Sequence, residues 1–169
     1  MTQERYGKIE RFFKAHKKLY FLIRIIYKYL PYPVYIIYPL ILINTFIHMI
    51  NANDAEEFVR TLVAPAVVFL SVTALRKIIN RPRPYEALKI NPLIKKNTVG
   101  QSFPSRHSAS VFIIAIVCYP INICLGVALT IVGITICISR ILAGVHYISD
   151  VLFGALYSII LGILSIFLI

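Results

Sequence analysis

The chain consists of long apolar runs separated by short polar segments. Four of these runs carry at most one charged residue each, and they cover residues 33–50, 58–75, 109–139 and 151–169. A helix that crosses the hydrocarbon core of a bilayer needs about 20 such residues. The run 109–139 is long enough for two short spans joined by a turn near 120–122. We therefore expect five transmembrane helices, at about 34–50, 58–78, 105–119, 122–142 and 148–169.

The N-terminal segment 4–30 shows a different pattern. Apolar side chains recur every three to four residues, with lysine and arginine on another side, as in an amphipathic helix. Such a helix either lies in the headgroup plane or forms a short sixth span with its second half, whose cations reach back to the membrane surface. Pro31 and Pro33 are expected to end the helix in both cases.

Composition agrees with an integral membrane protein. Hydrophobic residues make up 59% of the 169 residues and the mean hydropathy is +0.77, which is too apolar for an ordinary soluble domain. We expect one all-α domain over residues 1–169, a polytopic membrane helical bundle with a basic amphipathic helix at 1–31 and a polar loop at 80–104. Small residues spaced four apart favour close helix packing near the C-terminus, at Gly154, Ser158 and Gly162.

The net charge of +11 is concentrated in two clusters, one in the first 28 residues and one in 76–96. Basic clusters beside spans are typical of cytoplasmic loops or of contacts with anionic lipid. A nucleic-acid partner is not indicated, because neither cluster comes with a known binding module or a sizeable soluble domain.

Unusual polar residues fall into three groups, each at the end of a span. The first group contains Arg76 near the last turn of the span 58–78, and Arg83 beyond a break imposed by Pro82 and Pro84. Two guanidinium groups that converge on one point suit a phosphate, which accepts bidentate hydrogen bonds. A simple basic membrane anchor is the alternative.

The second group follows Pro104 and contains Ser105, Arg106 and His107. A proline and serines just before an apolar run mark a helix N-terminus, whose free N–H groups and positive dipole end favour an anion. A serine can add a hydroxyl donor, and a histidine can give or accept a proton near neutral pH. The alternative is an ordinary N-cap followed by an interfacial histidine.

The third group is the most specific, with Ser139 and Arg140 followed by His146 and Asp150. A histidine and an aspartate four apart on a helix share one face. The carboxylate then holds one imidazole nitrogen and strengthens the other as a nucleophile. A structural His–Asp pair is the alternative, although ionisable residues at the membrane edge are usually functional.

Together the three groups resemble the signature of the type 2 phosphatidic acid phosphatase superfamily. That signature is Lys, six residues and Arg-Pro; then Pro-Ser-Gly-His; then Ser-Arg, five residues, His, three residues and Asp. Two positions depart from it, since Arg76 replaces the usual Lys and Arg106 replaces the usual Gly. The matching positions are Arg83-Pro84, Pro104-Ser105, His107, Ser139-Arg140, His146 and Asp150.

The resemblance implies roles for these residues. His146 attacks phosphorus and forms a phosphohistidine, Asp150 orients it, and His107 protonates the leaving group. The phosphoryl oxygens are bound by Arg76, Arg83, Ser105, Arg106 and Arg140. The implied enzyme needs no metal and no other cofactor, and the sequence has no cluster of acidic and histidine residues at metal-ligand spacing.

The implied substrate is a membrane lipid phosphate or diphosphate, such as phosphatidic acid, phosphatidylglycerol phosphate, undecaprenyl diphosphate or a lipid A phosphate. The implied location is the bacterial inner membrane, with the site facing away from the cytoplasm. The charge distribution instead favours a cytoplasmic site slightly, because the segment 51–57 is acidic and 80–103 is basic. A non-catalytic membrane protein that binds anionic lipid is the alternative function, whereas a vanadate-dependent oxidase is disfavoured because such relatives are soluble. The pattern leaves the oligomeric state open.

Overall fold

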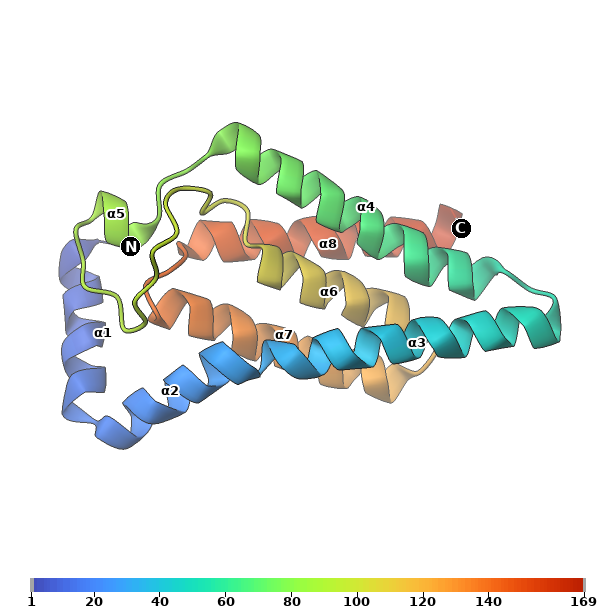
Figure 1. Cartoon of the computed structure of the whole chain (residues 1–169), viewed down its shortest axis with the longest axis horizontal. Coiled ribbons are helices and arrows are strands. Elements are labelled where there is room, and N and C mark those ends of the chain that lie inside the picture. Colours follow the sequence, from blue (N-terminus) through green and yellow to red (C-terminus); the bar gives the residue numbers. More distant parts are fainter. Residues whose placement is uncertain (1, 169) are drawn as a thin grey trace.

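A computed structural model of the chain describes residues 2–168, and all regular structure in this range is helical. Figure 1 shows the long helices lying side by side along one axis, with α1 across one end of the bundle. The all-α helical bundle that the sequence predicts is therefore confirmed. In chain order the helices are α1 (Gln3–Ala15), α2 (Lys17–Tyr29), α3 (Pro31–Ala52), α4 (Glu56–Ile79), α5 (Pro84–Ala87), α6 (Arg106–Cys118), α7 (Ile123–Leu142) and α8 (Ile148–Leu168).

Four helical segments are long and apolar enough to cross a membrane: Lys17–Ala52, Glu56–Ala87, Ile123–Leu142 and Ile148–Leu168. Their outer faces expose many large apolar side chains, which water would not tolerate as one continuous surface but which lipid solvates. The chain is therefore an integral membrane protein. Helix α6 has only 13 residues, fewer than the 20 or so that a bilayer requires, so the fifth span stays a prediction.

Helix α6 lies at the centre of the bundle and packs against α4, α7 and α8. The contact with α8 depends on small residues, as the sequence predicts. A Cβ atom at Gly154 would lie 2.7 Å from the backbone oxygen of Ser105, and one at Gly162 would lie 2.7 Å from the side chain of Ile116. This close approach brings the start of α8 against the start of α6, and the predicted site residues lie there.

The N-terminal segment differs from the single helix predicted over 4–30. The chain turns at His16 (φ −110°, ψ 78°), so α1 crosses the bundle end while α2 runs toward α3. Pro31 and Pro33 do not end the helix either. Pro31 begins α3, and Leu30 before it keeps a helical backbone (φ −60°, ψ −28°). Proline is compatible with a first helical turn because its missing N–H has no helical partner there.

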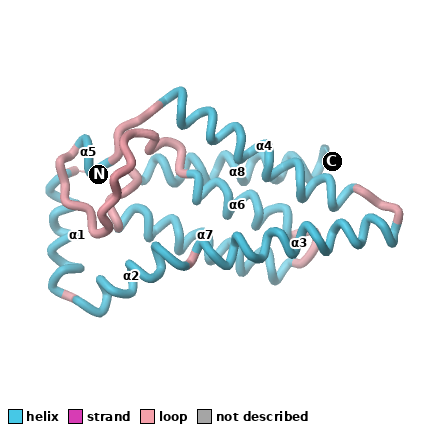
Figure 2. Tube along the Cα trace, in the orientation of Figure 1, coloured by secondary structure: helices cyan, strands magenta, loops and turns pink. Residues whose placement is uncertain are grey.

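The polar loop predicted at 80–104 is found between α4 and α6, interrupted by the single turn of α5. Figure 2 shows this loop gathered at the end of the bundle where α1 lies. The ends of α4 and α7 and the starts of α6 and α8 meet there as well. All three groups of polar residues therefore lie at the same end of the molecule.

Candidate active site at one end of the bundle

The first group begins with Arg76, in the last turn of α4. Its side chain is only 4% exposed, and its Nη1 atom donates to the backbone oxygen of Pro104 at 2.7 Å. Helix α4 ends at Asn80, whose left-handed conformation (φ 41°) redirects the chain. Arg76 therefore connects the first group directly to the second group.

Arg83 caps the short helix α5 and is also buried. Its Nε atom donates to the backbone oxygen of Gly100 at 3.0 Å, while its Nη1 atom has no protein acceptor. Glu86 accepts from the backbone nitrogen of Arg83 at 2.6 Å and from that of Gly100 at 3.0 Å. These contacts fold the loop so that Arg83 lies at the site with an uncommitted donor.

The second group forms the start of α6. The backbone nitrogen of Ser105 donates to the backbone oxygen of Asp150 at 2.9 Å, which joins the second group to the third. The hydroxyl of Ser105 accepts from the hydroxyl of Ser108 at 2.9 Å, so its own proton stays available. His107 lies in the first helical turn and lines a cavity, whereas Arg106 is exposed and lies at the rim.

The third group brings His146 and Asp150 together, but not on one helix face as predicted. His146 precedes α8 and lies in the turn after Gly144, whose positive φ (73°) suits glycine. Its Nδ1 atom lies 3.4 Å from Oδ2 of Asp150. This is an ion-pair distance without good hydrogen-bond geometry, since Nδ1 has no hydrogen-bond partner. The carboxylate of Asp150 accepts the backbone N–H of Tyr147 at 2.9 Å, which fixes this turn.

The electrostatics of His146 favour a neutral imidazole. Burial lowers its pKa to about 4, the nearby Asp150 carboxylate opposes that shift, and the Arg83 charge adds to it. A neutral imidazole has a free nitrogen lone pair, as a nucleophile requires. With Nδ1 toward Asp150, the nitrogen available for attack is Nε2.

Sequence analysis did not single out two further partners of Asp150. Nη1 of Arg81 lies 2.8 Å from Oδ1, and the hydroxyl of Ser102 donates to Oδ2. The guanidinium of Arg81 also lies 4.1 Å from the ring centre of Tyr147. The carboxylate is thus held from three directions, which fixes its position relative to His146. Arg81 lies between two signature positions, but nothing in the charge pattern distinguishes it from Arg83.

Arg140, at the end of α7, is held by the N-terminal part of the chain. Its Nη2 atom donates to the backbone oxygen of Tyr27 at 3.3 Å, and its guanidinium lies 3.9 Å from the centre of that ring. Its Nε atom has no protein acceptor although the residue is 3% exposed. Tyr27 was not predicted as a site residue, because it follows the same apolar spacing as its neighbours in α2.

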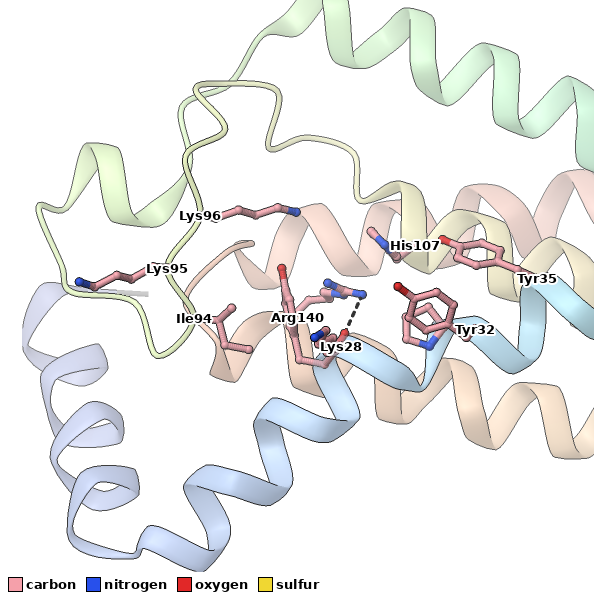
Figure 3. A pocket seen from close by; sticks show the side chains of 10 residues that line it. Lys28, Tyr32, Tyr35, Ile94, Lys95, Lys96, His107 and Arg140 are labelled. Atoms are coloured by element: carbon pink, nitrogen blue, oxygen red, sulfur yellow. Dashed lines mark hydrogen bonds between the residues drawn. The ribbon is translucent and has the colours of Figure 1, made fainter.

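A cavity of about 310 Å³, lined in part by basic side chains, opens beside these residues. Figure 3 shows Arg140 and His107 facing it, with Lys28, Lys96 and Tyr32 around them. His146 does not line this cavity and is only 3% exposed, so other side chains separate its imidazole from the cavity.

The described residues bring the predicted phosphate ligands Arg76, Arg83, Ser105 and Arg140 to one end of the bundle, with Arg106 at its rim. They can offer an anion several N–H donors together with the backbone at the start of α6. No three Cys, His, Asp or Glu side chains within residues 2–168 converge as a metal-binding group.

Comparison with known proteins identifies the family. A sequence model of the PAP2 superfamily matches residues 57–168. The chain belongs to the PAP2 superfamily. The resemblance drawn from the three groups is therefore confirmed, and the family places the protein among membrane lipid phosphatases. A search of curated protein sequences finds no match to this chain.

Two solved structures resemble the chain over most of its length. LpxE from Aquifex aeolicus is 30% identical with a TM-score of 0.69, and the match covers 88% of this chain and 93% of LpxE. A transmembrane PAP2-type phosphatidylglycerolphosphate phosphatase from Bacillus subtilis is 22% identical with a TM-score of 0.61, covering 89% of this chain and 76% of that protein. The second match is informative about the fold alone.

Proposed function

We propose that this protein hydrolyses a membrane lipid phosphate or diphosphate through a phosphohistidine at His146, without a metal ion. The observation that carries the proposal is a buried imidazole whose Nδ1 atom lies 3.4 Å from a carboxylate, beside buried guanidinium groups with unpaired N–H donors. Buried cations are costly unless an anion compensates them. A phosphoryl group matches both their charge and their geometry.

The mechanism assigns each group one task. Nε2 of His146 attacks phosphorus while the carboxylate of Asp150 stabilises the charge that develops on the imidazole. Arg76, Arg83 and Arg140 bind the phosphoryl oxygens, together with the hydroxyl of Ser105 and the rim residue Arg106, as charge redistributes in the transition state.

Proton transfer is assigned to His107. Burial and the charges of Arg140 and Lys96 lower the pKa of its imidazole to about 2, so it holds the proton that it donates only while the phosphate anion of the substrate offsets those charges. It protonates the leaving oxygen and then accepts a proton from the water that attacks the phosphohistidine. Phosphate leaves, and His146 returns to its neutral form. The positive charge that a metal ion supplies in other phosphatases is supplied here by guanidinium groups.

A lipid substrate is supported by an apolar cavity of about 270 Å³ between α3, α4 and α6. A second cavity next to it includes Arg106 and His107, and the two share Tyr35, Phe69 and Ser110. We call the end of the bundle that carries the candidate site the catalytic end. The apolar tail of a lipid can therefore extend from the catalytic end toward the lipid-facing side of the bundle while its phosphate stays at the membrane surface. A small soluble phosphate ester has no use for such a path.

The proposal is tested by phosphate release from purified protein in detergent micelles. The panel contains phosphatidic acid, phosphatidylglycerol phosphate, undecaprenyl diphosphate and a lipid A phosphate, each with and without a chelator. We expect activity on at least one lipid that the chelator leaves unchanged and that His146→Ala abolishes. The matched control is His48→Ala, which changes an exposed histidine of α3 far from the site.

Two outcomes would reject the proposal. Loss of activity with the chelator would exclude the metal-free mechanism, and full activity of His146→Ala would exclude this nucleophile. Binding of anionic lipid without any turnover would instead support a non-catalytic member of the family.

We also propose that the site faces away from the cytoplasm. Asn97, an exposed residue of the polar loop, tests this when it is replaced by cysteine in a chain that lacks the three native cysteines. Labelling of intact cells by a membrane-impermeant thiol reagent is the expected result. Labelling only after the membrane is opened would place the site on the inner side.

A further inference from the structure

Lys96 is a cation at the catalytic end that the mechanism above does not use. It lies in the polar loop before α6, is half-buried and lines the cavity of about 310 Å³ with Lys28, His107 and Arg140. Figure 3 shows its ammonium group extending across the cavity, whereas the neighbouring Lys95 points away from it. The loop therefore presents one of two adjacent lysines to the site.

Lys96 has no negative partner. Within residues 2–168 it takes part in no ion pair. Partial burial and the charges of Arg83, Arg140, Arg76 and Arg106 together lower its pKa to about 8. A half-buried ammonium among like charges is unfavourable by itself, so an anion in the cavity would stabilise it.

The position of Lys96 identifies the part of the substrate that it meets. In an in-line displacement the attacking nitrogen and the leaving oxygen lie on opposite sides of phosphorus. His146 attacks, and His107 protonates the leaving oxygen. Lys96 lines the same cavity as His107, and His146 does not line it. The ammonium therefore lies on the side of the leaving group.

We propose that Lys96 binds the leaving group of the substrate and gives the enzyme a preference for a lipid diphosphate over a lipid monophosphate. The inference rests on the proposed function. In a lipid diphosphate, Nε2 of His146 bonds to the terminal phosphorus and the P–O bond between the two phosphates breaks. The leaving group is then an anionic lipid monophosphate, which Lys96 and Lys28 can neutralise. When the substrate is instead the monophosphate of the same lipid, the bond between phosphorus and the ester oxygen breaks, and His107 protonates that oxygen. The leaving group is then a neutral alcohol with no charge for the two lysines to bind.

The test compares kcat/KM for a lipid diphosphate and for the monophosphate with the same tail. We expect Lys96→Met to lower the diphosphate value about 30-fold and the monophosphate value less than about 3-fold, as the loss of one charge-assisted contact implies. Lys89→Met, which changes an exposed lysine of the same loop outside the cavity, is the matched control and should change neither value. Retained monophosphate activity shows that the Lys96→Met protein is folded.

Equal losses on both substrates would overturn the inference, because Lys96 would then bind the transferred phosphoryl group. No loss on either substrate would overturn it as well. A wild-type protein that is inactive on every lipid phosphate would refute the proposed function itself. Activity on monophosphates with no effect of Lys96→Met would refute only this inference.

A pH series gives a second readout. The ammonium of Lys96 loses its proton as pH rises through about 8, so the preference for the diphosphate should fall between about pH 7 and about pH 9. Four guanidinium groups act on it from nearby, those of Arg76, Arg83, Arg106 and Arg140. The other titratable groups that line the cavity are His107, Lys28, Lys95, Tyr27, Tyr32 and Tyr35.

The variant Lys96→Arg distinguishes the titration of Lys96 from that of the other groups in the cavity. It leaves those groups in place but replaces the titrating ammonium with a permanent positive charge. Its preference for the diphosphate should stay constant across the same pH range. A preference that falls equally in Lys96→Arg and in wild type would assign the titration to another group and contradict the inference.

Discussion

The catalytic end has two walls that are built differently. The inner wall consists of the ends of α4 and α7, the starts of α6 and α8, and residues 80–87, 100–105 and 143–147. It carries the signature residues within the segment that matches the PAP2 superfamily. Its polar groups are joined by direct hydrogen bonds, one between Arg76 and Pro104 and one between Ser105 and Asp150. The outer wall consists of α1, α2 and residues 88–99, and it contributes the cavity lining opposite His107.

A tyrosine of α1 joins the outer wall to the inner wall, and a tyrosine of α2 joins two parts of the outer wall. The hydroxyl of Tyr6, in α1, accepts from the backbone nitrogen of Leu93 at 3.0 Å and donates to the backbone oxygen of Leu142 at 3.4 Å. The hydroxyl of Tyr20 donates to the backbone oxygen of Leu93 at 3.2 Å. We therefore assign the bond-breaking chemistry to charged residues of the inner wall, whereas tyrosine side chains of α1 and α2 position the outer wall.

The largest effect is expected in the inner wall, from Asp150→Asn. This change removes the charge that orients His146 and that pairs with Arg81, at little cost in volume. We expect kcat to fall about 10³-fold or more. Asp54→Asn, in the exposed turn between α3 and α4, is the control and should leave phosphate release unchanged. A loss below about tenfold would mean that the carboxylate is structural only.

A smaller effect is expected in the outer wall, from Tyr6→Phe. Tyr6 is fully buried, and its ring fills the space where a side chain at Gly144 would lie. The substitution keeps the ring but leaves the Leu93 N–H without an acceptor, which costs about 1–3 kcal/mol. Because the ring still supports the turn before His146, we expect kcat to fall no more than about tenfold.

The matched control is Tyr29→Phe, which changes an exposed tyrosine of α2. Thermal unfolding measured beside the kinetics separates stability from activity. If Tyr6→Phe reduced kcat as much as Asp150→Asn does, the distinction between the two walls would fail.

The smallest effect is a shift in the titration of His146, measured by NMR with labelled histidine in micelles. Its pKa of about 4 means that the imidazole stays neutral from pH 7 down to about pH 5 and gains a proton only below that range. Arg83→Met removes a nearby positive charge, so the pKa should rise. An unperturbed value near 6.5 in wild type would contradict the buried position of the nucleophile.

Much of this architecture was predictable from the sequence. The spans expected at 34–50, 58–78, 122–142 and 148–169 correspond to α3, α4, α7 and α8, because hydrophobic length is a strong local signal. The residue spacing within the three polar groups likewise predicted which side chains lie together at the candidate site. The packing role of Gly154 also followed from spacing alone.

The remaining features depend on tertiary contacts. The apolar period continues unbroken through His16, so nothing local marks the turn that sends α1 across the bundle. Its direction depends on the burial of Tyr6 against residues far along the chain. Likewise, Arg81 reaches Asp150 because Asn80 adopts a left-handed backbone. A pattern of charges cannot show such a change of direction.

The central claim is that His146 carries the phosphoryl group during turnover. The direct measurement is rapid quenching of the enzyme in alkaline denaturant while it acts on a ³²P-labelled lipid phosphate, followed by peptide mapping. We predict a label that is stable to alkali and labile to acid, located on His146 and absent from His146→Ala. Label on another residue, or none at a time when phosphate release is under way, would contradict the account.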